Sequence, residues 1–120
     1  MASQTNAHIR TGQAGENRAA AYLQEQGYTI LRQNYRHRRA EVDIIAQKEN
    51  LLVFVEVKTR GTDRYGYPEE AVDFRKEALL LNAADAYIEE SGWQHEARFD
   101  IIAVTLTVPA TVHHIEDAFH

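Results

Sequence analysis

Apolar and polar residues follow two different periods along this chain, and the changes of period predict a mixed α/β fold. Between Ala14 and Gln26 apolar residues recur at helical spacing, and Gly27 supplies a stop signal, so we expect a helix that begins near Thr11. Short apolar segments with strand-forming residues follow it. They predict three strands at 28–35, 41–46 and 51–58.

The second half of the chain predicts a long helix and two further strands. Pro68 suits a first helical turn, and apolar residues from Val72 to Ile88 keep the helical period until Gly92. Strands are expected at 98–105 and 111–115. A strand, a long helix and another strand favour a right-handed crossover, so the strand at 98–105 should run parallel to that at 51–58. The predicted order is αβββαββ, with a central mixed sheet flanked by helices.

A tight turn should join the strands at 41–46 and 51–58 into a hairpin. A two-residue loop at 49–50 pairs Lys48 with Leu51 and thereby sets the register. Counting outward from this pair places Asp43 opposite Glu56. Because side chains alternate between the two faces of a sheet, one face of the hairpin then carries only apolar residues, namely Val42, Ile44, Ala46, Val53, Val55 and Val57.

The other face of the hairpin is apolar near the turn and charged at its far end. Asp43 faces Glu56 there, and the same register sets Glu41 beside Lys58. Opposed carboxylates destabilise a sheet by about 0.2 to 1 kcal/mol unless a cation lies between them. Lys58 is one candidate cation, and a divalent metal ion is another, because Mg²⁺ prefers carboxylate oxygens. A solvated salt bridge is the simpler alternative, but apolar residues on both faces indicate a central strand and favour a site in a cleft.

Length and composition narrow the class of protein. We expect a flexible N-terminal tail over residues 1–10 and a single domain over residues 11–120. The absence of cysteine excludes a disulfide framework and thiolate chemistry, and it suits a cytoplasmic protein. No segment approaches the roughly 18 apolar residues of a membrane span, so the sequence predicts neither a signal peptide nor a membrane protein.

Charge is unevenly distributed within the net value of −5. Residues 1–64 carry a net charge of +3 and residues 65–120 carry −8, so a polyanion would approach the half that contains the carboxylates. Arginines and aromatic rings flank these carboxylates in sequence, which favours contacts with nucleic acid, although any one arginine in a connection can serve only to keep it solvated. The candidate nucleic-acid contacts are Arg36, Arg38, Arg39, Arg60, Arg64, Tyr65 and Lys76.

Polar residues in the last two predicted strands have a simpler interpretation. Asp100 interrupts an apolar strand, and we expect a buried acid whose hydrogen bonds are satisfied and which supports the sheet. His113 and His114 are adjacent on a strand and must point to opposite faces, so they cannot simply share a metal ion.

The element order, with Asp43 on the second strand and Glu56-Val57-Lys58 on the third, resembles the core of the restriction-endonuclease-like, or PD-(D/E)XK, nucleases. Over residues 12–119 the chain looks more closely like the YraN family, bacterial proteins that are similar to archaeal Holliday-junction resolvases. The chain departs from the usual family pattern at Ala40, where the family has Gly, and at Asp117, where it has Asn. The matching motifs include Gly15-Glu16, Gly27-Tyr28, Asn34-Tyr35-Arg36, Glu41-Val42-Asp43-Ile44-Ile45-Ala46, Val53-Phe54-Val55-Glu56-Val57-Lys58-Thr59-Arg60, Gly66, Pro68, Lys76, Arg98-Phe99-Asp100 and Ile115-Glu116-Asp117-Ala118-Phe119.

This resemblance implies hydrolysis of phosphodiester bonds with Mg²⁺ or Mn²⁺ held by Asp43, Glu56 and the carbonyl of Val57. Lys58 would hold the attacking water or neutralise developing charge. Glu16 is similarly placed to a metal-assisting acid of the resolvases, although a glutamate near a helix start that favours the helix dipole is an equal explanation. Glu41, beside Lys58 in the predicted register, completes the candidate catalytic set.

Three functions from different classes stay open at this point. The first is a Mg²⁺- or Mn²⁺-dependent endonuclease acting on branched or single-stranded DNA, and an enzyme that cuts four-way junctions would need two sites and hence a homodimer. The second is a nucleic-acid-binding or assembly protein that retains the nuclease fold with little catalysis. The third is a protein-interaction domain whose acidic C-terminal half binds a basic partner.

Overall fold

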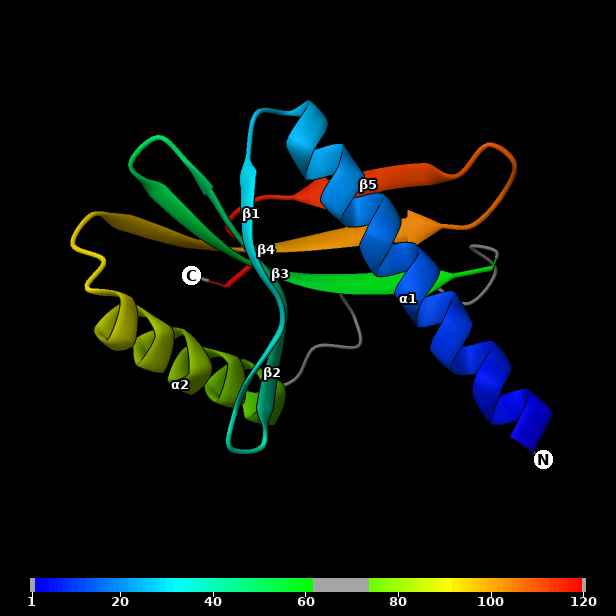
Figure 1. Cartoon of the computed structure of the whole chain (residues 1–120), viewed down its shortest axis with the longest axis horizontal. Helices are drawn as coiled ribbons and strands as arrows, with labels where there is room; N and C mark the ends of the chain where they lie inside the picture. The colour runs from blue at the N-terminus through cyan, green and yellow to red at the C-terminus, as the bar shows by residue number, and fades with distance from the viewer. Residues whose placement is uncertain (1, 62–73, 120) are drawn as a thin grey trace.

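The computed structural model describes the backbone of residues 2–61 and 74–119, and within these ranges the side chains of residues 11–61 and 76–119. The described elements follow the predicted order αβββαββ (Figure 1). Their bounds are α1 Ala2–Glu25, β1 Thr29–His37, β2 Ala40–Lys48, β3 Leu51–Arg60, α2 Phe74–Ser91, β4 Glu96–Thr105 and β5 Thr111–Ile115.

Helix α1 begins much earlier than the sequence suggests. It starts at Ala2, so the predicted start near Thr11 was wrong. Residues 2–10 contain neither glycine nor proline, and nothing in them interrupts the helical backbone. In Figure 1 this first part of α1 reaches past the edge of the sheet. The predicted flexibility of residues 1–10 stays a prediction.

The five strands form one mixed sheet in the order β1-β2-β3-β4-β5. Strands β3 and β4 are parallel, as the crossover through α2 predicts, and the other neighbouring strands are antiparallel. The β2–β3 hairpin closes with the pair Lys48 and Leu51, which confirms the predicted loop and register near the turn. This mixed sheet with two helices is compatible with the restriction-endonuclease-like fold.

The two helices cover opposite faces of the sheet. Ala19 and Leu23 of α1 pack in one buried cluster with Ile44, Ala46, Val53, Val55, Ile102 and Val104. Leu80, Ala83, Ala84 and Tyr87 of α2 pack in the other with Tyr35, Ala40, Val42, Ile45, Leu52 and Phe54.

One residue of the predicted apolar face, Val42, lies on the opposite face of the sheet from the other residues predicted to share its face. Val42 packs against α2, whereas its expected companions Ile44 and Ala46 pack against α1. Asn34, which lies between the β1 partners of Ile44 and Val42, has a left-handed backbone (φ 54°), whereas the register shift of this strand pair lies earlier, between Ile30 and Arg32. Figure 1 shows the same region bending toward α2, so that the β1–β2 turn lies beside that helix.

Gly15 allows α1 to approach β3 closely. A Cβ atom at this position would collide with the side chain of Thr59, near the end of β3. Glycine inside a helix costs about 0.5 to 1 kcal/mol relative to alanine, so the residue is best explained by the contact that it permits. The close approach brings the next residue, Glu16, to the end of the sheet where the predicted acids lie.

Candidate active site

Pairing between β2 and β3 ends at Ile44 and Val55, just before the acids of both strands. In a two-residue hairpin the closing pair exchanges both backbone hydrogen bonds, and every second pair does the same, so Val42 and Val57 would be the next bonded pair. The N–H of Val57 instead donates to Oδ2 of Asp43 at 2.7 Å. The Asp43 carboxylate therefore occupies the position of a strand carbonyl, at the point where the two strands separate.

Glu56 is almost completely buried, with 8% of its surface exposed. Its Oε1 lies 3.2 Å from Nζ of Lys76, which reaches it from α2. Its other oxygen, Oε2, is buried and has no hydrogen-bond partner among the described residues. One half of this carboxylate is thus neutralised, and the other half is available to a ligand.

The amines of Lys58 and Lys76 are joined by a hydrogen bond. Burial and a hydrogen bond with Lys76 lower the pKa of Lys58, and the neighbouring acids only partly oppose this. Burial also acts against the charge of Lys76, but the bond to Lys58 and the charge of Glu56 outweigh it and raise the pKa of Lys76. The pair therefore favours a charged Lys76 beside Glu56 and a Lys58 that gives up its proton more readily than an ordinary lysine.

Glu16 adds a third acid from the α1 face. Burial and the charge of Glu41 raise the pKa of Glu16, although a hydrogen bond with Asn34 opposes them. Oε1 of Glu16 is buried and has no hydrogen-bond partner in the described part of the chain. Because α1 begins at Ala2, Glu16 lies well inside the helix, and the alternative explanation of a first-turn glutamate that favours the helix dipole no longer applies.

Asp43 lies at the electrostatic centre of the group. Burial raises its pKa to about 7 against the opposing hydrogen bond from Val57, and repulsion from Glu56, Glu16 and Glu41 adds to the rise. An added cation would relieve this repulsion and favour the ionised form. Strongly shifted acids with an unfilled hydrogen-bonding capacity are typical of functional sites.

Glu41 departs from its predicted pairing. Its Oε2 lies 3.3 Å from Nε of Arg36 on β1, so the expected partnership with Lys58 is replaced by this ion pair. The β2–β3 ladder does not extend to Glu41, because the strands have already separated. Glu41 acts on the site through its charge, which raises the pKa of both Asp43 and Glu16.

The carboxylate and carbonyl oxygens beside Asp43 suit a hard divalent cation. In an extended strand the N–H and C=O of one residue point to the same side, so the Val57 carbonyl faces β2, like the N–H that binds Asp43. Among the described residues, no three His, Asp or Glu side chains are arranged to hold a metal ion together. Asp43, Glu56 and the Val57 carbonyl could supply oxygen ligands with water, the pattern usual for Mg²⁺.

The candidate nucleic-acid contacts are spread around this group. Arg38 and Arg39 form the tip of the β1–β2 turn, and Arg36 precedes them on β1. Arg60 ends β3, two residues after Lys58. Lys76, expected at a phosphate, is paired with Glu56. Arg64 and Tyr65 lie outside the described residues.

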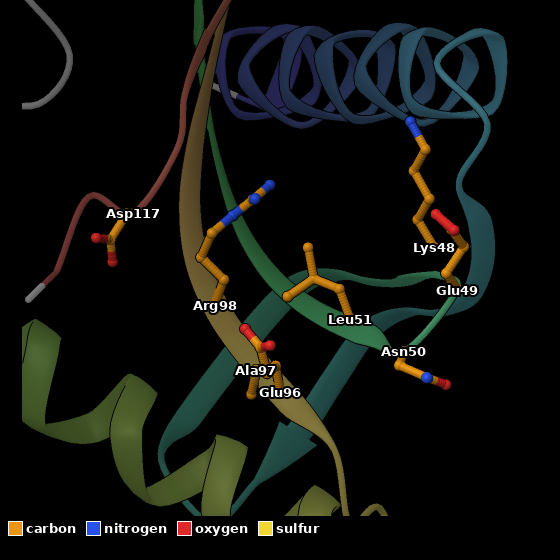
Figure 2. Close-up of a pocket in the computed structure, with 8 residues that line it drawn as sticks. All are labelled: Lys48, Glu49, Asn50, Leu51, Glu96, Ala97, Arg98 and Asp117. Carbon is orange, nitrogen blue, oxygen red and sulfur yellow. The ribbon is translucent and has the colours of Figure 1, made fainter.

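A cavity of about 520 Å³ lies at the opposite end of the hairpin. Figure 2 shows it between the β2–β3 turn at Glu49 and Asn50 and the start of β4, with Arg98 and Asp117 at its far wall. Leu51, at the start of β3, lines this cavity, whereas Glu56 lies farther along the same strand and no residue of the acid group lines it, so the cavity is separate from the candidate active site.

A second carboxylate centre surrounds Asp100, which is fully buried. Arg98 donates to both of its oxygens at 2.8 Å, and Nε2 of His114 lies 2.7 Å from Oδ2. The backbone N–H of Asp117 donates to Oδ1, and Tyr22 of α1 bonds the far side of the His114 ring. Burial favours the neutral acid, but these donors prevail and hold the pKa of Asp100 below its usual value. The expectation of a satisfied buried acid is confirmed.

Sequence reasoning assigned no role to Asn34. Its left-handed backbone sits inside β1, and its side chain hydrogen-bonds Glu16 across to α1. Asparagine is a poor strand former and one of the few residues that tolerates this conformation, so its presence in a strand was a usable signal. The reach of Lys76 to Glu56 had no such signal, because it depends on how α2 docks.

No helix among the described residues is both long and apolar enough to cross a membrane.

Comparison with known proteins places the chain in a family. Residues 15–104 match the uncharacterised protein family UPF0102. A UPF0102 protein of Bacteroides thetaiotaomicron is 46% identical over 114 residues, which cover 94% of each chain. Another from Cytophaga hutchinsonii is 45% identical over 98 residues, 82% of this chain and 87% of the relative, and one from Syntrophus aciditrophicus is 45% identical over 114 residues, 93% and 90% respectively. These matches confirm the resemblance drawn from the motifs, and the chain belongs to the UPF0102, or YraN, family.

Proposed function

We propose that this protein is an endonuclease that hydrolyses DNA phosphodiester bonds with Mg²⁺ or Mn²⁺. The supporting observation is the group of Glu16, Asp43 and Glu56, in which two buried oxygens have no hydrogen-bond partner among the described residues. Two lysines adjoin these acids, so the group combines sites for a cation with groups that can move a proton.

Each residue has a distinct role in this proposal. Asp43, Glu56 and the Val57 carbonyl would hold the metal ion, which when bound polarises the phosphate and lowers the pKa of a bound water. Lys58, whose pKa is lowered, accepts a proton from the attacking water. Lys76 orients Glu56 through its ion pair. Glu16 stabilises positive charge from the α1 side.

Purified protein incubated with labelled duplex, single-stranded and four-way-junction DNA tests this proposal. We expect cleavage with Mg²⁺ or Mn²⁺ and none with EDTA. Asp43→Asn and Lys58→Met should each reduce cleavage by about 100-fold or more, as loss of a metal ligand or proton acceptor does in related chemistry. Glu49→Gln, in the exposed turn at the other end of the hairpin, is the matched control. Cleavage that survives Asp43→Asn would show that the activity belongs elsewhere.

Junction cutting would in addition require a pair of sites. Two copies of the chain related by a twofold axis would supply them, because the two cleaved strands of a junction are themselves symmetric. Sedimentation of the protein with and without junction DNA measures this directly, and a strict monomer that cuts only single strands would leave the nuclease proposal standing without the homodimer.

A second candidate is a nucleic-acid-binding or assembly protein with little hydrolysis. It is favoured by the ion pair of Lys76 with Glu56, which neutralises one acid without a metal ion. In that case DNA binding would be insensitive to metal ions and to Asp43→Asn, and no cleavage would occur. The same incubation therefore separates the two candidates.

A further inference from the structure

A second cavity, of about 590 Å³, lies between the β1–β2 turn and α2. One wall is the β1–β2 turn from His37 to Ala40, and the other is a row of α2 residues that includes Leu79, Asn82 and Asp85. The row starts one helical turn after Lys76, and Ala40 directly precedes Glu41, so both walls lead into the acid group. Its volume lies within the range of sites that hold small ligands.

The lining of this cavity combines three kinds of chemistry. Arg38 and Arg39 are exposed and cationic on the turn, whereas Asn82 and Asp85 offer amide and carboxylate groups on the helix. Among the residues that the structure describes, none of these four side chains makes a hydrogen bond or an ion pair. Leu79, 39% exposed, contributes an apolar surface beside them.

This combination matches an unpaired nucleotide better than a duplex backbone. A groove for duplex phosphates would be basic throughout, and Asp85 and Glu89 would repel it. An unpaired nucleotide presents a phosphate to the arginines, a flat ring to the apolar surface and a free base edge to amide and carboxylate groups. A paired base has that edge engaged and its ring stacked, so it cannot enter a cavity.

Arg38 has an unusual backbone that fits this interpretation. Its φ is 58°, the left-handed region in which glycine is comfortable and arginine is strained. An arginine at such a turn position carries a conformational cost. Its side chain is exposed at the mouth of the cavity and makes no hydrogen bond or ion pair with the described residues that would offset this cost.

We infer that this cavity binds one unpaired DNA nucleotide next to the bond that the acid group cleaves. Arg38 and Arg39 contact its phosphate, and Asn82 and Asp85 contact the edge of its base. The inference rests on the proposed function, since it names the form of DNA that the site would act on: single strands, flaps or unpaired positions at junctions.

Binding measured without catalysis tests this inference separately from hydrolysis. Fluorescence anisotropy of the Asp43→Asn protein in EDTA would report affinity for a labelled single strand and for a fully paired duplex of the same sequence. We expect the single strand to bind more tightly. Asn82→Ala combined with Asp85→Ala should weaken single-strand binding by about tenfold, the scale of a lost bidentate base contact, and leave duplex binding no weaker.

The sign of this effect is decisive, because removal of a carboxylate should strengthen DNA binding if only charge mattered. Gln24→Ala combined with Glu25→Ala removes the same two groups from the exposed end of α1 and is the matched control, with no loss of affinity expected. Arg38→Gly should weaken single-strand binding while it raises thermal stability, since glycine relaxes the backbone.

The outcomes distinguish this inference from the proposed function. Unchanged or tighter single-strand binding by the Asn82 and Asp85 double variant would overturn the inference, even if the unaltered protein cuts DNA in a metal-dependent way. Weakened single-strand binding by that variant would support the inference, even if no metal ion supports cleavage and the proposed hydrolysis fails.

Discussion

Two carboxylate centres lie on neighbouring strands of the sheet, Asp43 and Glu56 on β2 and β3 and Asp100 on β4 beside Val55, and they differ in how completely they are paired. Asp100 receives donors from Arg98, His114 and a backbone N–H, and its pKa is held below the usual value. Asp43 lies among other acids, and burial and repulsion raise its pKa to about 7. A fully satisfied acid stabilises the fold, whereas an under-satisfied group of acids costs stability and is kept where chemistry needs it.

The largest expected effect is the loss of the Asp100 network. Asp100→Ala leaves Arg98 and His114 without their shared acceptor, and loss of one partner from a buried ionic network costs about 3 to 5 kcal/mol. Urea denaturation measures the free energy of unfolding. A loss under about 1 kcal/mol would mean that this centre does not stabilise the protein more than a surface ion pair does.

Added Mn²⁺ should stabilise the Asp43 centre and leave the Asp100 centre unaffected. A ligand at a hundred times its dissociation constant raises the free energy of unfolding by about 2.7 kcal/mol. We expect a rise on this scale in thermal denaturation of the unaltered protein, and none in a variant that carries both Asp43→Asn and Glu56→Gln. Equal stabilisation of both proteins would place the ion elsewhere.

Gly15→Ala should disturb the Asp43 centre, because it should displace α1, which carries Glu16. Alanine normally stabilises a helix relative to glycine, but here its Cβ would collide with Thr59, and overpacking costs about 1 to 3 kcal/mol. Displacement of α1 would also move Glu16 and weaken Mn²⁺ affinity. Thr59→Ala removes two of the three colliding atoms and should restore part of both losses. A stabilised Gly15→Ala protein would contradict the close approach.

The smallest effect is a pH dependence that has opposite signs at the two centres. The folded protein binds a proton at Asp43 more tightly than the unfolded chain does, so stability should fall as pH rises from about 4 to 7. Asp43→Asn should remove this slope and be more stable than the unaltered protein at pH 8 by about 1 to 2 kcal/mol.

Asp100 acts the other way, because its lowered pKa gives stability that is lost only as pH falls below about 4. Urea denaturation from below pH 4 up to pH 8 measures both slopes. Identical slopes for Asp43→Asn and the unaltered protein would refute the raised pKa of Asp43.

Local sequence patterns predicted most of the fold. The element order, the parallel crossover and the Lys48–Leu51 hairpin closure follow from periodicity, chain handedness and loop length, which act over short stretches. The start of α1 was not predictable in this way, since residues 2–10 carry no clear start or stop signal.

The candidate site was predictable in composition but less so in geometry. Register counting placed Asp43, Glu56 and Lys58 at one end of the hairpin, but it extended the ladder past the point where β2 and β3 separate. Glu41 therefore pairs with Arg36, and Asp43 binds the Val57 N–H. The positions of Glu16 and Lys76 depend on how two helices dock on the sheet, and no local pattern in the sequence encodes that docking.

The acids and amines of the Asp43 centre come from three layers, with Glu16 on α1, Asp43 and Glu56 on the sheet and Lys76 on α2. A nascent chain emerges with α1 and the first three strands before α2 is made, so it holds the acids long before the lysine that neutralises one of them. Mutual repulsion of these acids then opposes their premature assembly. The pairing of Glu56 with Lys76 is therefore the last contact of the centre to form along the growing chain, and it depends on the docking of α2 onto the sheet.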